Sequence, residues 1–308
     1  MKKCTSCGRM FSDEHPDFCE SCGGTVFEMV SPPKKKEKAP LSILKAWLYT
    51  AAYTGVNYAV AFAAIIPLAI IYLDPEDPDH LTKILTTDIS NLITLAGYVL
   101  FAVLLTVFFL IRKKNVLRET GIGKCSLPVL AVSALFGVSA NYLYSFVIGV
   151  IPWPDSLLEA HNDAYALLDG DGNILLTVVT VALFTGILEE VVYRGLVMTR
   201  LRRSVHPAVA CVISALLFSF AHPSIISAVY TFVFGACLAL VFEKYSSTLP
   251  CIVAHVCFNL MACIGYPEGG TATIIILAAC AILHVASIIA LVKLPVAKGA
   301  KADGAESI

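Results

Sequence analysis

The chain has little charge for its length. Only 15% of its 308 residues are Asp, Glu, Lys or Arg, whereas 57% are hydrophobic, and the mean hydropathy is +0.78. A soluble domain of this length carries more charge. The formal net charge of −1 gives no support for nucleic-acid binding. The composition is that of a polytopic membrane protein. The sequence also lacks His-Glu-x-x-His, the helical zinc motif of many metalloproteases.

Long apolar runs recur from residue 46 onward, and a helix needs about 20 such residues to cross a bilayer. The runs are long and do not alternate, which favours helices over a β-barrel. We therefore predict an all-α fold of about eight transmembrane helices, the fifth and seventh of them short. They are centred on 46–73, 88–111, 127–151, 174–199, 207–222, 225–242, 249–264 and 272–293.

Basic residues gather in alternate loops, as the positive-inside rule requires. The basic segments are 34–38, 112–124, 200–203, 243–244 and 293–301. Both termini are thus expected in the cytoplasm, in a plasma membrane, since nothing marks an organelle. The expected domains are a zinc ribbon (1–28), a basic Pro/Lys linker (29–45), a membrane domain (46–294) and a cytoplasmic tail (295–308).

Four cysteines near the N-terminus form two Cys-x-x-Cys pairs, Cys4 with Cys7 and Cys19 with Cys22. Two such pairs can place four thiolates tetrahedrally around Zn²⁺. The segment is too short for a hydrophobic core, so metal binding would stabilise its fold. Disulfides are disfavoured at a cytoplasmic location. We predict a structural zinc ribbon, whose partner the sequence does not identify.

Ionisable residues inside membrane helices are costly and are usually functional. Glu189 and Glu190 lie in one apolar run, and Arg194 follows Glu190 by one helical turn, so it can neutralise that carboxylate. Glu189 is left without such a partner and is the candidate general base.

Two further apolar runs carry polar groups: His222 ends one, and His255 lies one turn before Asn259 on another. A hydrolytic site needs a base, a second proton-handling group and donors for an oxyanion. Counted from the cytoplasmic ends at 1.5 Å per residue, Glu189, His222 and His255 lie about 15, 20 and 10 Å deep, so convergence stays open. The other histidines (His15, His80, His161, His206 and His284) are expected to have no catalytic role.

The three motifs, Glu189-Glu190-x3-Arg194, Phe218-x3-His222 and His255-x3-Asn259, resemble those of the CPBP family, the type II CAAX prenyl endopeptidases and their bacterial relatives. The resemblance covers residues 130–265. It implies an eight-helix fold that cleaves peptide bonds inside the membrane. It further implies that Glu189 and His222 activate a water, that His255 and Asn259 stabilise the oxyanion, and that Glu190 and Arg194 organise the site.

The sequence thus favours an intramembrane endopeptidase whose active site opens toward the cytoplasm. Its substrate would be a membrane-associated protein or peptide, and its surroundings the lipid bilayer. We favour a water activated by glutamate, with catalytic Zn²⁺ as the alternative. The alternative function is a non-catalytic membrane scaffold or a bacteriocin self-immunity protein of the same fold.

Overall fold

The fold is given by a computed structural model. It describes residues 2–6, 10–11, 18–23, 25–29, 38–72, 85–165, 172–265 and 270–296. The chain divides into two compact units, Met1–Glu37 and Lys38–Ile308. Residues 30–37 of the basic linker and 297–308 of the C-terminal tail lie outside the described residues, as does Cys7.

The first unit is a small antiparallel sheet. Its strands are β1 (Lys2–Cys4), β2 (Met10–Phe11) and β3 (Phe27–Met29), with β1 in the middle. A tight turn follows Cys19, whose carbonyl accepts hydrogen bonds from the amides of Cys22 and Gly23. Gly23 has φ +69°, which glycine adopts without strain. Such a turn suits a Cys-x-x-Cys knuckle.

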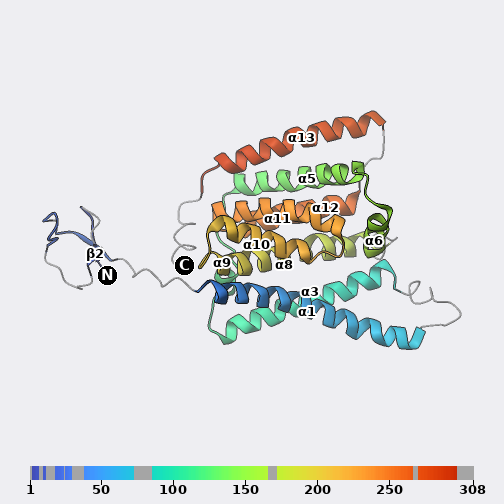
Figure 1. The fold of residues 1–308 in the computed structure, drawn as a ribbon, viewed down its shortest axis with the longest axis horizontal. Helices are drawn as coiled ribbons and strands as arrows, with labels where there is room; N and C mark the ends of the chain where they lie inside the picture. Colours follow the sequence, from blue (N-terminus) through green and yellow to red (C-terminus); the bar gives the residue numbers. More distant parts are fainter. Residues whose placement is uncertain are drawn as a thin grey trace. The chain divides into compact units, whose positions relative to one another are not determined.

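The second unit is a helical body (Figure 1). Figure 1 shows α13 at one edge, α1 and α3 at the opposite edge, and α10, α11 and α12 between them. Its helices are α1 (Ala39–Tyr72), α3 (Thr87–Ile111), α4 (Val116–Glu119), α5 (Leu127–Val150), α6 (Asp155–Tyr165), α7 (Ile174–Thr177), α8 (Thr185–Glu190), α9 (Thr199–Leu201), α10 (Pro207–Phe220), α11 (Ile225–Tyr245), α12 (Leu249–Ile264) and α13 (Gly270–Lys293).

Six helical segments of the described chain are long and apolar enough to cross a membrane. They correspond to six of the eight predicted spans. The two spans predicted to be short are α10 and α12, with 14 and 16 residues. The all-α membrane fold is therefore confirmed. Two details differ: α1 begins at Ala39, inside the predicted linker, and the loop before residue 174 contains helix α6.

The segment Ile174–Leu201 is one continuous helix, called the rod below, and it contains two π-helical stretches. These are η1 (Val178–Phe184) and η2 (Val191–Met198), and α8 lies between them. Thr185 and Thr199 each donate a side-chain hydrogen bond to the carbonyl five residues earlier. Such π-helical stretches occur often at functional sites, and here they flank Glu189 and Glu190.

Three glycines let this rod and α12 approach their neighbours closely. A Cβ on Gly137 of α5 would lie 2.0 Å from the carbonyl oxygen of Ala254, and one on Gly186 would meet Val256 at 2.9 Å. A Cβ on Gly195 would lie 2.2 Å from the carbonyl oxygen of Thr120. These approaches fix α12 against α5 and α8.

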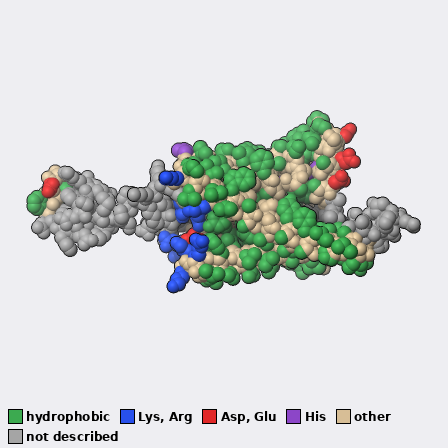
Figure 2. All heavy atoms as spheres, turned by 60° about the horizontal axis from the view of Figure 1, so that its bottom comes forward, with side chains coloured by type: hydrophobic (Ala, Val, Ile, Leu, Met, Phe, Trp, Pro, Cys, Tyr) green, Lys and Arg blue, Asp and Glu red, His purple; other side chains and the backbone are tan. Residues whose placement is uncertain are grey.

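Charge separates the two ends of the helical body, as Figure 2 shows. We call the end with α4, α9 and the last turns of α3 and α13 the basic end. Its cationic residues include Arg112, Lys113, Lys114, Arg118, Lys124, Arg200, Arg202, Arg203, Lys244 and Lys293. The opposite end, where α6 exposes Asp155, Glu159 and Asp163, we call the acidic end.

We expect Gly137→Ala to destabilise the helical body by about 1–3 kcal/mol, because the new methyl group overlaps backbone that cannot move freely. Gly149→Ala on the same helix is the matched control, since no atom lies within 4 Å of its Cβ position. Thermal unfolding in detergent gives the melting temperatures of both variants and of the wild type. Equal melting temperatures for Gly137→Ala and wild type would contradict the close contact of α5 with α12.

Candidate functional site

The centre of the site is a fully buried ion pair. Nη1 of Arg194 lies 2.6 Å from Oε1 of Glu190, and both side chains have no exposed surface. Nη2 of Arg194 donates to the carbonyl of Gly235 at 2.8 Å, and the guanidinium lies over the ring of Phe218. The predicted neutralisation of Glu190 by Arg194 is therefore present in the structure. Such a pair is tolerated in a low dielectric only because the two charges neutralise each other.

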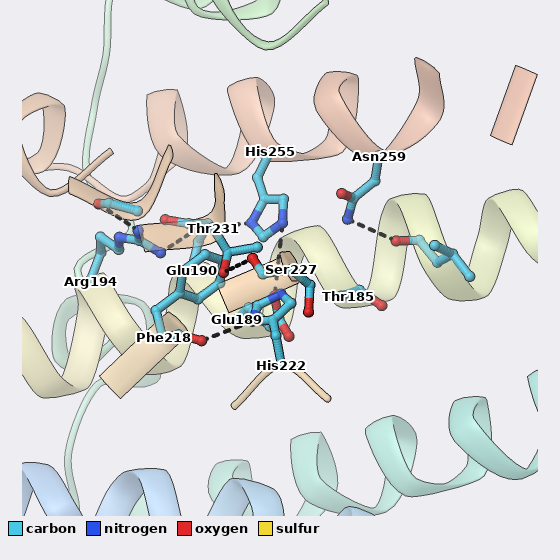
Figure 3. A network of polar contacts seen from close by, with 12 residues as sticks. Thr185, Glu189, Glu190, Arg194, Phe218, His222, Ser227, Thr231, His255 and Asn259 are labelled. Carbon is cyan, nitrogen blue, oxygen red and sulfur yellow. Dashed lines mark hydrogen bonds and ion pairs between the residues drawn. The ribbon is translucent and has the colours of Figure 1, made fainter. Parts of the chain in front are cut away.

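Glu190 also orients His255. Oε1 of Glu190 lies 2.9 Å from Nδ1 of His255. Since a carboxylate only accepts, Nδ1 carries the hydrogen of this bond. Nε2 then faces the second carboxylate, and it lies 3.8 Å from Oε2 of Glu189. Phe218 and Phe234 meet the imidazole through T-shaped contacts, with centroid distances of 5.7 and 5.5 Å. The result is a chain of contacts from Arg194 through Glu190 and His255 to Glu189 (Figure 3).

His222 reaches the site because α10 ends early. The helix stops at Phe220, and Pro223 prevents its continuation. Nδ1 of His222 lies 2.9 Å from the carbonyl oxygen of Phe218. A carbonyl also only accepts, so Nδ1 donates and Nε2 keeps its lone pair. Figure 3 shows His222 and Glu189, which both line the cavity described below.

Asn259 follows His255 by one turn of α12. Its Nδ2 donates to the carbonyl of Val181 in η1 at 3.0 Å. This bond ties α12 to the rod that carries Glu189. The amide has a second N–H, which remains available to a ligand.

Glu189, His222, His255 and Asn259 line one cavity of about 610 Å³. Its volume is in the range of small-molecule and peptide pockets. The cavity wall follows the rod through Thr177, Val181 and Thr185 to Glu189. These residues repeat every four positions, so they share one helical face. Three separate helical segments therefore bring their predicted polar groups to a single cavity.

The direction of this cavity differs from the expectation. Its lining includes Ile148 and Gly149 at the end of α5 and His161 and Tyr165 of α6. All of these lie toward the acidic end, whereas the sequence predicted an opening toward the basic, cytoplasmic loops. Helix α6 lies in a loop between two predicted spans, and no sequence pattern indicated that this loop contributes to the cavity wall.

A second cavity of about 250 Å³ reaches Glu189 from the α1–α3 side. Hydroxyl and amide groups line it, from Thr54, Asn57 and Thr94 among others. Tyr98 lines both cavities, and it lies close enough to Glu189 to interact with it electrostatically. Glu189 is thus approached from two sides.

Sequence reasoning missed several wall residues. His161, expected to have no role, lines the large cavity, and its Nδ1 lies 2.7 Å from Oγ of Ser224. Asn141 and Ser145, one turn apart on α5, line it as well. A search for polar pairs four residues apart inside apolar runs would have found this last pair.

His284 lies outside this cavity. Its Nδ1 is 3.2 Å from Oγ of Ser139, and its ring stacks on Phe136. Ser139 is fully buried and also donates to the carbonyl of Phe136. The serine has no access to a substrate, so this contact serves packing.

The N-terminal unit contains a candidate metal centre. The sulfurs of Cys4, Cys19 and Cys22 all lie within 4.8 Å of one another, and those of Cys4 and Cys22 are 3.6 Å apart. Sulfurs bound at about 2.3 Å to one tetrahedral Zn²⁺ lie about 3.8 Å apart, so the three thiols fit this ion. The predicted fourth ligand, Cys7, lies outside the described residues. Among the described residues, these three cysteines are the only group of three or more His, Cys, Asp or Glu residues whose ligand atoms all lie within 4.8 Å of one another.

A comparison with protein families supports the expected resemblance. Residues 171–261 match the family model described as type II CAAX prenyl endopeptidase Rce1-like. The matched range contains all seven residues of the three motifs, from Glu189 to Asn259. Neither the curated proteins nor the solved structures provide a significant match to the chain.

We expect the full-length protein, purified without chelators, to contain one zinc ion per chain. Cys19→Ser should lose it, because three thiolates hold the ion much less tightly than four. Cys257→Ser on α12 is the control and should keep the metal. Elemental analysis of the purified variants decides, and an unchanged zinc content in Cys19→Ser would contradict the ribbon.

We expect Glu190→Gln to lower stability by about 3–5 kcal/mol, because it leaves the buried Arg194 cation without its counter-charge. Glu189→Gln should have a much smaller effect, since Glu189 lines the cavity and its ion-pair contact, with His255, is long at 3.8 Å. Thermal unfolding in detergent compares the two. The double variant Glu190→Leu/Arg194→Met should regain part of the loss. Equal losses for the two single variants would contradict this division of roles.

Proposed function

We propose, from the type II CAAX endopeptidase match over residues 171–261 and the geometry of the larger cavity, that the chain is an intramembrane endopeptidase. It would hydrolyse peptide bonds of membrane-associated proteins or peptides. The observation that carries the proposal is the contact of His255 with both carboxylates, one neutralised by Arg194 and the other facing the cavity.

Glu189 is the general base in this mechanism. Its carboxylate takes a proton from a water molecule, and the hydroxide so formed adds to the carbonyl carbon of the scissile bond. Nε2 of His222 keeps its lone pair and can hold the second hydrogen of that water. The proton taken by Glu189 then passes to the leaving amine, so the carboxylate is restored after each cycle.

Asn259 and His255 would stabilise the tetrahedral intermediate. They lie one turn apart on α12 and both face the cavity. The second N–H of Asn259 can donate to the oxyanion, as can Nε2 of His255 when it is protonated. Donors fixed before the reaction are worth about 2.7–4 kcal/mol each in such sites. Glu190 and Arg194 position His255 without touching the substrate.

The apolar helices make this a membrane protein. We propose that it lies in the plasma membrane and that its basic end faces the cytoplasm, as the positive-inside rule requires.

We also propose that Glu189 activates water without a metal. Zinc that persisted in a purified Cys4→Ser/Cys19→Ser variant would contradict this, because it would place a metal among Glu189, His222 and His255.

We expect Glu189→Gln and His222→Ala each to lower cleavage at least about 100-fold, because each removes a proton-handling group. The measurement compares the amounts of uncleaved membrane proteins in cells that carry the wild-type protein with those in cells that carry a variant. His206→Ala, which changes an exposed histidine at the other end of α10, is the control and should cleave normally. Full cleavage by both site variants, at normal protein levels, would favour a non-catalytic scaffold or self-immunity role.

A further inference from the structure

The larger cavity extends from Glu189 in one direction only. Along the rod its wall continues to Thr177, twelve residues and about 18 Å toward the acidic end. Along α12 it continues past Asn259 to Ala262 and Cys263 in the last turn. The lining residues of α5 likewise run to its last turn.

The basic end below Glu189 is closed by a loop, residues 120–124. Oγ1 of Thr248 donates to the carbonyl of Thr120 at 2.7 Å. The backbone amide of Thr248 donates to the carbonyl of Gly121 at 2.8 Å. Oγ of Ser247 donates to the carbonyl of Gly123 at 2.9 Å. Thr120, Ser247 and Thr248 are all at most 2% exposed. Two buried hydroxyls and one backbone amide thus hold the three backbone carbonyls of this seal in place.

Packed side chains fill the space between the seal and the catalytic residues. Tyr193, Leu196 and Val197 of η2 have no exposed surface, and Gly195 lies directly against Thr120. Arg200 adds an ion pair with Glu119 at 2.7 Å. A peptide arriving at the basic end would have to displace this core to reach Glu189.

Helix α6 forms the rim at the other end. His161 and Tyr165 face the cavity, and the contact of His161 with Ser224 fixes α6 to the start of α11. The opposite face of α6 exposes Asp155, Glu159 and Asp163. The rim is therefore amphipathic, as expected for a helix at the membrane surface.

We infer that the catalytic cavity is entered from the acidic end. The substrate is then a peptide segment presented at the membrane face opposite to the basic loops, which is the non-cytoplasmic face under the positive-inside rule. A C-terminal tail in the cytoplasm would meet the seal instead. That a peptide substrate enters this cavity rests on the proposed function, whereas the direction of access rests on the cavity alone.

Cysteine labelling in intact cells tests the direction without any cleavage assay. Ser145→Cys and Thr177→Cys place reporters in the cavity wall, and Lys113→Cys places an exposed one at the basic end. The native Cys125 near the seal is a poor reporter, because burial raises the pKa of its thiol. A charged, membrane-impermeant maleimide is added outside, and mass spectrometry quantifies labelling at each residue.

We expect both cavity reporters to label at least about tenfold faster than Lys113→Cys in intact cells, because access to the reagent governs thiol reactivity here. All three should label after the cells are permeabilised. Faster labelling of Lys113→Cys in intact cells, or cavity labelling only after permeabilisation, would overturn the inference. If instead Glu189→Gln cleaves normally while the labelling order holds, the proposed hydrolysis fails and the direction of access stands.

Discussion

The site depends on burying one ion pair inside a membrane protein. An unpaired guanidinium or carboxylate at the position of Arg194 or Glu190 would cost several kcal/mol. The pair therefore holds two neighbours in place: Gly235 of α11, whose carbonyl binds Arg194, and His255 of α12, whose imidazole binds Glu190. One electrostatic requirement thus positions three helical segments and leaves Glu189 as the carboxylate that faces the cavity.

Close backbone packing gives this arrangement its precision. Gly137, Gly186 and Gly195 allow the helices to approach so closely that a methyl group would overlap the neighbouring chain. In a membrane, where lipid is as apolar as the helix surfaces, such contacts and interhelical hydrogen bonds stabilise association. The bond from Asn259 to Val181 has the same effect. The two glutamates are adjacent in α8, so their side chains point in different directions.

The sequence predicted the helices and the polar motifs because both have strong local signals: long apolar runs and charges inside them. It could not predict convergence, because depths counted along straight helices placed His222 and His255 at different levels. In the structure, Thr248 is held against Thr120 and Gly121, so α12 begins inside the helical body. His255 therefore lies deeper than the count from the cytoplasmic end predicted. The direction of the cavity was also missed, because it depends on α6 and on tertiary contacts that no local pattern encodes.

A cavity closed at one end suits hydrolysis inside a membrane. Water must reach Glu189, yet a continuous water path across the bilayer would let ions and protons leak. The hydrogen-bonded seal around Thr120 and Thr248 separates the wet cavity from the basic end, while the rim at α6 leaves the other end accessible. The glycine at position 195 serves both needs, because it brings the seal against the rod that carries the proposed catalytic base, Glu189. In the proposed mechanism, the contacts that fix the geometry of the site would thus also determine the side from which a peptide arrives.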